Sequence, residues 1–575
     1  NAYVINFYGG ILFMKFSEMP YTRPDTDKIR AQYDELISRF KNAGSADEQI
    51  KIMSEEETLR NHFFTEATLV SIRNSVNTKD EFYDKENEFI DEHSPFVSEK
   101  IQEFTDALLA SKFRPELEKH YGKLLFKNYE IAARCFDPKI IPLMQEENKL
   151  VSAYQKLYGS AIVDFDGKKL PLPMLAPYKE SKDRDIRRAA FEADGKFFDE
   201  HREEFDDLFD KLVKIRTKIA HELGYKNFIQ LGYDRLGRNC YGPEQVAKFR
   251  EAIAKDAVPV VGEVKELQRK RIGVDTLILY DNGFTFSDGT AVPEGTAEDI
   301  LAAGKTMYHG LSPETAEFID FMYDNELLDV LSKEGKAPGG YCTFIPDYKS
   351  PFIFSNFNGT AGDVDVLTHE AGHAFQAYRA AKLGIMSDLS SPTMETCECH
   401  SMSMEFLTSD YHHLFFGKNT AKYELSHAED ALCFIPYGCM VDEFQHRMYE
   451  NPDLTPAERN EIWASLEKKY RPYLHTEGLP FYGRGAGWQR QLHIYMYPLY
   501  YIDYCMAQTV AFQFWLAYME NKEDAWKRYL EFTDKAGTKT FEEVVSEAGL
   551  FLPYGEGGMK KICESVGNWI KAHQI

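Results

Sequence analysis

The sequence predicts a mainly α-helical protein in which one small β-sheet precedes a metal-binding helix. Apolar residues recur at helical spacing from about residue 26 to 160 and again from about 184 to 223. The best strand region is short, at residues 341–345 and 351–357, and a helical pattern resumes after it. A chain of 575 residues can bury a large core, so we expect two or more domains or one large multi-lobed unit.

The N-terminal part of the chain is expected to be helical after a short lead segment. Residues 1–13 are mildly apolar, are too short to span a bilayer and have no basic region, so no secretory signal is expected. They precede Met14 and are predicted to be an N-terminal extension or an expression remnant. Residues 14–190 are predicted to form a helical region with a β-hairpin at 162–170, which turns at Asp166-Gly167. Its first helix carries one apolar stripe, formed by Ile29, Tyr33, Leu36, Ile37 and Phe40.

Charge and cysteine content limit the partners and the compartment. The formal net charge is −25 and the pI is near 5.2, so neither nucleic acid nor an anionic membrane is an expected partner. The nine cysteines are an odd number without the spacing of a disulfide framework. We therefore expect reduced thiols in the cytoplasm. The oligomeric state is not predicted.

The segment His369-Glu370-Ala371-Gly372-His373 spells H-E-x-x-H within a helical pattern. Histidines at i and i+4 share one helical face, so both imidazoles can reach one metal ion, and Glu370 lies beside them near a bound water. In a chain with 16 histidines this motif arises by chance with a probability of roughly a few per cent. A third ligand would make the site convincing.

A second helix supplies the expected third ligand, Glu398. Ser391 and Pro392 are predicted to be its N-cap and its first helical residue. One of its faces carries acidic and apolar residues together, which favours a cation site over a solvated face; this face comprises Met394, Glu398, Ser401 and Glu405. Glu405 is expected to orient a zinc-binding histidine.

Residues 483–504 form a glycine-rich and then tyrosine-rich stretch. Gly483 to Gly487 are predicted to be a mobile loop near a cleft. Tyr497, Tyr501 and Tyr504 fall on one helical face, although for Tyr495 and Tyr497 a place in an aromatic core is favoured. Tyrosine hydroxyls in a cleft could donate to a developing oxyanion.

These motifs resemble the zinc oligopeptidase family that includes thimet oligopeptidase and oligoendopeptidase F, more the branch of oligoendopeptidase F and bacterial Pz-peptidase. The match comprises H-E-x-x-H, Glu398 with Glu405 beyond it, and the stretch from His493 to Tyr504. The resemblance implies a zincin-like catalytic region in a large helical bowl or ellipsoid with a deep channel. It also implies His369, His373 and Glu398 as zinc ligands, Glu370 as general base, and His493, Tyr501 and Tyr504 around the scissile carbonyl. The interval from His493 to Tyr501 is one residue shorter than in the thimet branch, so Tyr500, Tyr501 and Tyr504 all remain candidates for the oxyanion donor.

The predicted function is that of a zinc-dependent endopeptidase, an oligoendopeptidase with one Zn²⁺ per chain and its catalytic region at residues 191–575. It would degrade short unstructured oligopeptides, with Glu370 assisting attack by a zinc-bound water. One alternative is a peptidyl-dipeptidase, whose carboxylate clamp could come from Arg471, Arg484 or Arg490. The other is a non-catalytic helical peptide-binding protein.

Overall fold

The computed structural model describes residues 7–8, 11–12 and 14–575, so the predicted N-terminal extension lies largely outside the described residues. The chain forms two compact units, each built from three separate stretches. Unit 1 comprises Asn1–Ala133, Val292–Thr420 and Ala517–Leu550, and unit 2 comprises Arg134–Ala291, Ala421–Leu516 and Phe551–Ile575. The predicted division into consecutive regions at residue 190 stays a prediction.

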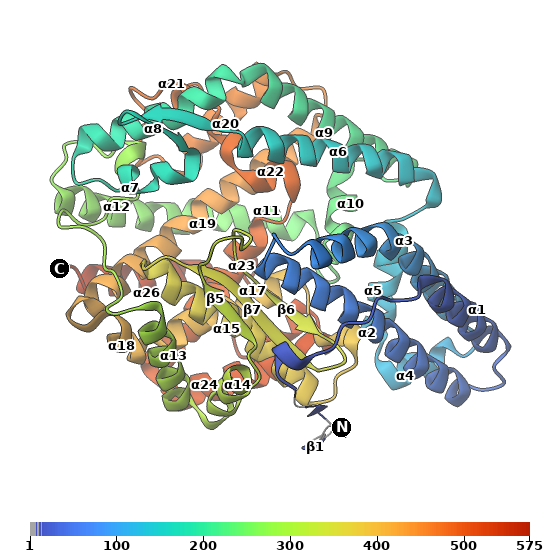
Figure 1. Ribbon diagram of the computed structural model, residues 1–575. Helices are drawn as coiled ribbons and strands as arrows, with labels where there is room; N and C mark the ends of the chain where they lie inside the picture. Colours follow the sequence, from blue (N-terminus) through green and yellow to red (C-terminus); the bar gives the residue numbers. More distant parts are fainter. Residues whose placement is uncertain (1–6, 9–10, 13) are drawn as a thin grey trace. The chain divides into compact units, whose positions relative to one another are not determined.

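Unit 1 contains the three-stranded sheet and the helices on either side of it in the sequence (Figure 1). Its elements are β1 (Phe7–Tyr8), β2 (Ile11–Leu12), α1 (Thr26–Asn42), α2 (Ala46–Val76), α3 (Glu81–Leu109), α4 (Arg114–Tyr121), α5 (Lys123–Arg134), α13 (Ala297–Leu311), α14 (Pro313–Asp324), β5 (Leu328–Leu331), β6 (Tyr341–Ile345), β7 (Ser350–Phe357), α15 (Ala361–Lys382), α16 (Ser387–Ser390), α17 (Met394–Leu407), α18 (His413–Phe416), α24 (Lys522–Asp534) and α25 (Phe541–Glu547).

Unit 2 is helical except for one hairpin. Its elements are α6 (Ile141–Gly159), β3 (Ile162–Phe165), β4 (Lys168–Pro171), α7 (Ala176–Lys179), α8 (Arg184–Glu200), α9 (Arg202–Glu222), α10 (Phe228–Arg235), α11 (Pro243–Ala252), the π-helix η4 (Ile253–Ala257), α12 (Val258–Ile272), η5 (Leu279–Asp281), α19 (Thr420–Glu450), α20 (Pro456–Tyr470), α21 (Pro480–Gly483), η8 (Gly487–Arg490), α22 (Leu492–Met496) and α26 (Gly558–Ala572). Helix α23 (Ile502–Glu520) begins in unit 2 and ends in unit 1.

The N-terminal helices of unit 1 form where the periodicity predicts them. Asp25, Ser45 and Asp80 cap α1, α2 and α3, because each side chain accepts a hydrogen bond from a backbone N–H of the first turn. The predicted apolar stripe of α1 is buried against α2 and α3, with Tyr33 and Phe40 fully inside. Burying that stripe positions these helices through the hydrophobic effect.

The sheet of unit 1 has the strand order β5-β7-β6, with β5 parallel and β6 antiparallel to β7. β7 is the central strand, and it is almost entirely buried because α15 packs on it. β6 is an edge strand whose register pairs Tyr341 with Phe354 and Ile345 with Ser350. The strands β6 and β7 were predicted, whereas the short β5 has no clear period-2 pattern in the sequence and was missed.

The predicted mainly α-helical fold is confirmed, as is the hairpin at β3 and β4. Asp166 and Gly167 have φ angles of 51° and 69°, which is the turn geometry that an Asp-Gly pair favours. Among the described residues, no helix has both the length and the apolar character to cross a membrane. The bowl and channel implied by the family resemblance stay predictions.

Candidate active site

A side chain of helix α15 stabilises the turn that precedes this helix. The Asp363 carboxylate accepts hydrogen bonds from the backbone N–H groups of Asn358 and Gly359, and Gly359 has a φ of 82°. A carboxylate in the first turn satisfies free N–H groups and interacts favourably with the helix dipole. The chain therefore passes directly from the central strand β7 into the helix that carries H-E-x-x-H.

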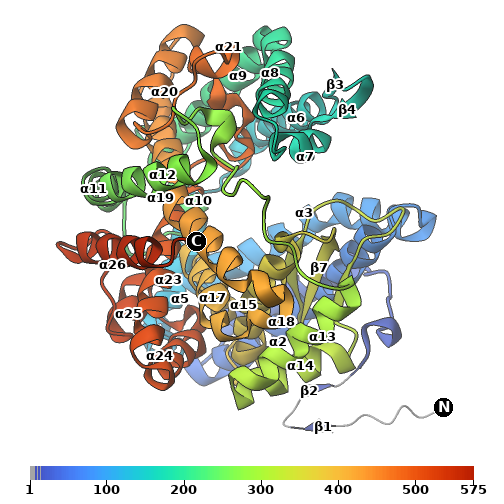
Figure 2. The same ribbon diagram turned by 90° about the vertical axis from the view of Figure 1, so that its left-hand side faces the viewer.

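Gly372 lets α17 approach α15 closely (Figure 2). A Cβ at this position would lie 2.6 Å from Ser401 Cα and 2.9 Å from the carbonyl oxygen of His400. Both are backbone positions and cannot move aside without separating the helices. The glycine inside H-E-x-x-H is thus required for packing.

The start of α17 differs from the prediction. The helix begins at Met394 with Thr393 as its N-cap residue, so Ser391 is not the N-cap and Pro392 is not the first helical residue. Thr393 has ψ 156°, an extended conformation, which ends the preceding segment two residues later than expected. The residues of the predicted acidic and apolar face still lie on one side of α17, because that face depends only on spacing within the helix.

The three predicted metal ligands come together at the α15–α17 contact. Nε2 of His369 lies 3.4 Å from Glu398 Oε2, and Nε2 of His373 lies 3.7 Å from the same oxygen. All three donor atoms lie within 4.8 Å of one another. Two ligands bound at about 2.0–2.1 Å to a tetrahedral zinc ion are about 3.3–3.4 Å apart. The spacing and the two-nitrogen, one-carboxylate donor set therefore fit zinc.

Two further side chains contact the predicted ligands His369 and Glu398. Glu405 Oε1 lies 2.6 Å from Nδ1 of His369, on the side of the ring opposite Glu398. Ser401 donates a hydrogen bond to Glu398 Oε2 at 3.3 Å. A carboxylate behind a ligating imidazole fixes its tautomer and its orientation. Glu405 occupies the position that was predicted for it.

The electrostatics of the two histidines differ. Burial lowers the pKa of His373 to about 4, and proximity to His369 adds to this, so His373 is neutral and able to ligate at neutral pH. Burial also opposes the charged form of His369, but its hydrogen bonds to Glu398 and Glu405 outweigh this and raise the pKa of His369. Two carboxylates around His369 favour a positive charge at this point.

Glu370 lies on the same helix and lines a cavity of about 350 Å³ together with the predicted ligands His373 and Glu398. Burial raises the pKa of Glu370, and the nearby carboxylates of Glu398 and Glu405 add to this. Residues 342–344 of the edge strand β6 form another wall of this cavity. An edge strand beside a candidate metal site can pair with the backbone of an extended peptide.

The remaining predicted residues form a second cluster, in unit 2. His493 is on α22, and its ring centroid is 4.7 Å from that of Tyr501 and 6.0 Å from that of Tyr504. Tyr500 lies 6.2 Å from His493 by the same measure. The four rings are therefore neighbours, with Tyr501 nearest to His493. Their roles stay predictions.

Tyr497 does not share a helical face with Tyr501 and Tyr504, and it is not a core residue. Helix α22 ends at Met496, α23 starts only at Ile502, and Tyr497 is 56% exposed. Pro498 disfavours helical geometry at the residue before it, and Leu499 adopts a φ of 66°. Tyr495, in contrast, is fully buried and stacks on Tyr154, as its predicted core role requires.

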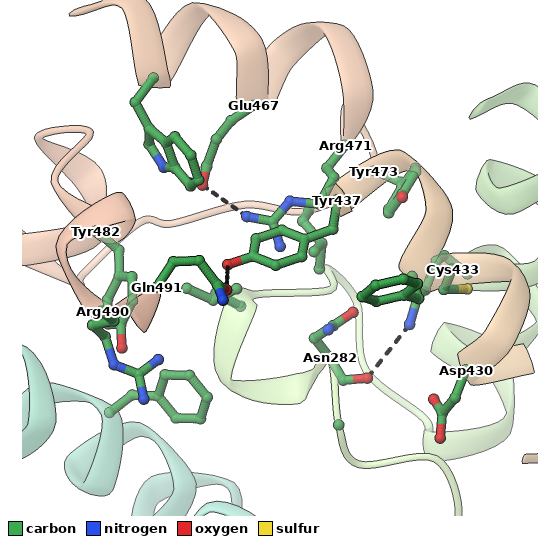
Figure 3. A pocket seen from close by; sticks show the side chains of 18 residues that line it. Asn282, Asp430, Cys433, Tyr437, Glu467, Arg471, Tyr473, Tyr482, Arg490 and Gln491 are labelled. Atoms are coloured by element: carbon green, nitrogen blue, oxygen red, sulfur yellow. Dashed lines mark hydrogen bonds and ion pairs between the residues drawn. The ribbon is translucent and has the colours of Figure 1, made fainter. Parts of the chain in front are cut away.

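Two residues beside the second cluster, Gln491 and Tyr437, were not predicted from the sequence. Gln491 Nε2 lies 2.8 Å from Nδ1 of His493, and the Tyr437 hydroxyl donates to Gln491 Oε1 at 2.7 Å (Figure 3). Burial lowers the pKa of His493, which favours the neutral ring. With Gln491 donating to Nδ1, the proton of that ring is on Nε2. Gln491 is only two residues before His493, which is the one signal that could have singled it out.

The arginines considered as a carboxylate clamp are each paired with an acidic side chain. Arg471 binds Glu467 at 2.7 Å, Arg484 binds Asp199 at 2.8 Å, and Arg490 lies 2.8 Å from Asp194. An arginine already neutralised in this way is a poor receptor for a free carboxylate on its own. None of the three is therefore an obvious clamp.

Helices α15 and α17 bring two histidines and one glutamate together, as in a metallopeptidase. Comparison with protein-family models agrees: the Peptidase M3 N-terminal domain matches residues 16–136, and Peptidase family M3 matches residues 177–562. The chain belongs to peptidase family M3.

Individual proteins with peptidase names are also similar to this chain. The solved structure of PZ peptidase A with an inhibitor is 47% identical, with a TM-score of 0.90 over 97% of this chain and 99% of that one. Oligoendopeptidase F of Lactococcus lactis subsp. cremoris is 22% identical over 404 residues, which are 64% of this chain and 61% of that protein. An oligoendopeptidase F homolog of Borreliella burgdorferi is 22% identical over 424 residues, 69% of each chain.

Proposed function

We propose that this protein is a zinc-dependent endopeptidase that hydrolyses short, unstructured oligopeptides. The observation that carries the proposal is the convergence of His369, His373 and Glu398 within 4.8 Å, beside a cavity that Glu370 also lines. Membership of peptidase family M3 and the 47% identity to PZ peptidase A support it. The nine free cysteines are consistent with the reducing cytoplasm as the place of action.

The residues of unit 1 would bind and activate the reactants. His369, His373 and Glu398 would hold the zinc ion, which when bound lowers the pKa of water and polarises a carbonyl. Glu370 accepts the proton of the attacking water and afterwards delivers a proton to the departing amine. The raised pKa of Glu370 suits a group that must both take and return a proton. The edge strand β6 holds the peptide backbone in an extended conformation.

The residues of unit 2 would stabilise the oxyanion. His493 is neutral with its proton on Nε2, so it can donate a hydrogen bond from that atom. Tyr501 or Tyr504 would supply a second donor, with Tyr501 favoured because its ring is nearest to His493. Removing one such donor reduces kcat by about 10²–10³ in enzymes that use them.

A peptidyl-dipeptidase on the same scaffold is the second candidate. Such an enzyme must recognise the terminal carboxylate two residues beyond the cut, and the pairing of Arg471, Arg484 and Arg490 with acidic side chains argues against the arginines as that receptor. We therefore favour the endopeptidase.

Zinc quantitation combined with mapping of cleavage products tests both candidates. Purified protein should contain about one equivalent of zinc, and a mixed library of peptides of roughly 5–20 residues should be cut at internal bonds at several distances from the C-terminus. Release of dipeptides alone would identify the peptidyl-dipeptidase. Zinc below about a tenth of an equivalent, with no cleavage after zinc is added, would indicate a non-catalytic peptide-binding protein.

A further inference from the structure

Unit 2 contains a second cavity, of about 550 Å³, that plays no part in the proposed metal chemistry (Figure 3). Its size is within the range of ligand-binding pockets. Aromatic rings form much of its wall, among them Phe191, Tyr437 and Tyr482. We call it the Lys265 pocket, after the lysine of α12 that lines it.

Lys265 is a buried cation without an acidic partner among the described residues. The residue is only 5% exposed, and its ammonium group donates to Gln268 Oε1 at 2.9 Å and to the carbonyl oxygen of Asn282 at 3.4 Å. Both acceptors are neutral. A buried charge is expensive unless a counter-ion compensates it, and an ammonium group has a third N–H to donate.

The acceptors of Lys265 are rigidly held. The Gln268 amide donates to the backbone carbonyls of Asp281, Asn282 and Phe284 at 3.0–3.1 Å, which leaves its Oε1 directed at the ammonium group. Lys265 is therefore fixed in place by α12 and by the segment after it. Preorganised donors lose little entropy when they bind a ligand.

Other polar atoms of the same cavity are also unsatisfied within the described part of the chain. The Tyr473 hydroxyl, Nε of Arg471 and Oδ1 of Asn282 are buried and have no hydrogen-bond partner. With Lys265 this gives three donors and one acceptor (Figure 3 labels the first three residues). A carboxylate with the N–H of its own peptide bond offers the complementary set of acceptors and donor.

The charge of the Lys265 pocket is positive although the whole chain carries −25. Lys265, Arg471 and Arg490 line it against only two acidic residues, Asp430 and Glu467. Glu467 is paired with Arg471, and the carboxylate that pairs with Arg490, Asp194, is shared with Lys179 at 3.3 Å. A local excess of cations in an acidic protein attracts an anion.

The Lys265 pocket lies beside the second cluster, the rings around His493 in unit 2. Tyr437 and Gln491 both line it, and Gln491 is hydrogen-bonded to His493. Tyr437 and Gln491 are thus shared between the wall of this cavity and the surroundings of His493.

We propose that the Lys265 pocket binds a carboxylate of the peptide substrate, with the Lys265 ammonium group as its main recognition element. This inference rests on the proposed peptidase function and adds a preference for acidic peptides or free C-termini. The carboxylate is that of the C-terminus or of an Asp or Glu side chain, since both present the same two oxygens. Such binding adds affinity and does not by itself set the distance from the cut to the end of the peptide.

Kinetics with matched peptides test the proposal in the zinc-loaded enzyme. Three N-acetylated pentapeptides of one apolar sequence would be compared: a free acid, a C-terminal amide, and an amide with one Glu replacing a residue near the C-terminus. The kcat/KM for at least one carboxylate-bearing peptide should exceed that of the plain amide by about 10–100-fold, the value of a charge-assisted hydrogen bond. Preference for the free acid assigns the C-terminus, and preference for the Glu peptide assigns the side chain.

A lysine substitution shows whether the preference comes from this pocket. Lys265→Gln should reduce the ratio of carboxylate to amide kcat/KM to near one, and Lys270→Gln, the same change at an exposed position of the same helix, should leave the ratio intact. No carboxylate preference in the wild-type enzyme, or an unchanged preference in a folded Lys265→Gln variant, would overturn the proposal.

Binding measurements keep the test decisive if Lys265→Gln does not fold or if no peptide is cleaved. N-acetyl-phenylalanine and its amide would be titrated calorimetrically into the wild-type protein. Tighter binding of the acid by about tenfold or more supports the pocket even without turnover, whereas equal binding refutes it. Absence of cleavage refutes the peptidase function alone, so the two failures are distinguishable.

Discussion

Glu405 Oε1 lies 2.6 Å from Nδ1 of His369, and Nε2 of the same ring faces Glu398 Oε2 at 3.4 Å. The imidazole is thus held between two carboxylates of one helix, α17. Because Nδ1–H donates to Glu405, Nε2 is the ring atom that can bind a metal ion once its own proton is released. This links the face of α17 predicted from sequence spacing to the chemistry of α15.

Glu405→Gln should weaken zinc binding by about 10–100-fold, because the neutral amide polarises the His369 ring less and holds its tautomer less firmly. Competition with a chelator of known affinity measures the change. Glu531→Gln, at an exposed position of α24, is the matched control and should bind zinc like the wild type. Equal affinities in all three proteins would show that Glu405 does not support the metal ligand.

Glu370→Gln should retain zinc but lose turnover, since the amide cannot accept the proton of the attacking water. The expected decrease in kcat is about 10²–10⁴-fold, the usual contribution of a general base. Zinc content and kcat are measured on the same preparation. A zinc-loaded variant that keeps more than a few per cent of the wild-type activity would disprove the role.

Gln491→Leu should lower kcat by about tenfold or more with little change in KM, because it releases the His493 ring from the tautomer that has its proton on Nε2. Tyr437→Phe removes only the outer hydrogen bond of the pair and should have a smaller effect on kcat. Steady-state kinetics on one peptide separates the two parameters. An increase in KM alone would assign Gln491 to substrate binding and not to positioning of His493.

Gly372→Ala should destabilise the protein by about 1–3 kcal/mol, since the added methyl group meets the backbone of α17 and overpacks the contact. Zinc affinity should fall too, because Glu398 moves away with α17. Thermal unfolding and zinc titration measure the two effects. Gly362→Ala, on the same helix, meets only a Thr360 side-chain oxygen at 3.3 Å and serves as the control, with no loss of zinc affinity.

Lys179 provides a pH-dependent contribution to stability. Burial lowers its pKa from 10.5 to about 8, and proximity to Arg490 adds to this, while Asp194 opposes it. Between these two values the unfolded state binds more protons than the folded state, so stability rises with pH in this window. The Tm of the wild type should therefore increase relative to Lys179→Met between pH 7.5 and about 10. Lys196→Met, at an exposed position of α8, should show a constant offset; a constant offset for Lys179→Met too would mean that its pKa is normal.

Local pattern predicted much of the fold because it depends on short-range geometry. The stripe from Ile29 to Phe40 became the buried face of α1, and Asp166-Gly167 became a hairpin turn. Predictions failed at helix ends, where the backbone conformation of one or two residues decides where a helix begins or stops. Thr393 and not Ser391 precedes α17, and Pro498 with Leu499 breaks the helix on which Tyr497 was expected.

The amino-acid sequence alone determined that His369 and His373 face the same way with Glu370 beside them, since helical periodicity orients residues four apart without any other part of the chain. Only the tertiary structure decided that Glu398 meets those histidines, that Gly372 allows it, and that Gln491 contacts His493. These relationships depend on how helices pack and where loops return, and packing is set by long-range contacts that no local spacing records. The burial of Lys265 without an acidic partner among the described residues was likewise decided only by the tertiary structure, because burial is a property of the folded chain.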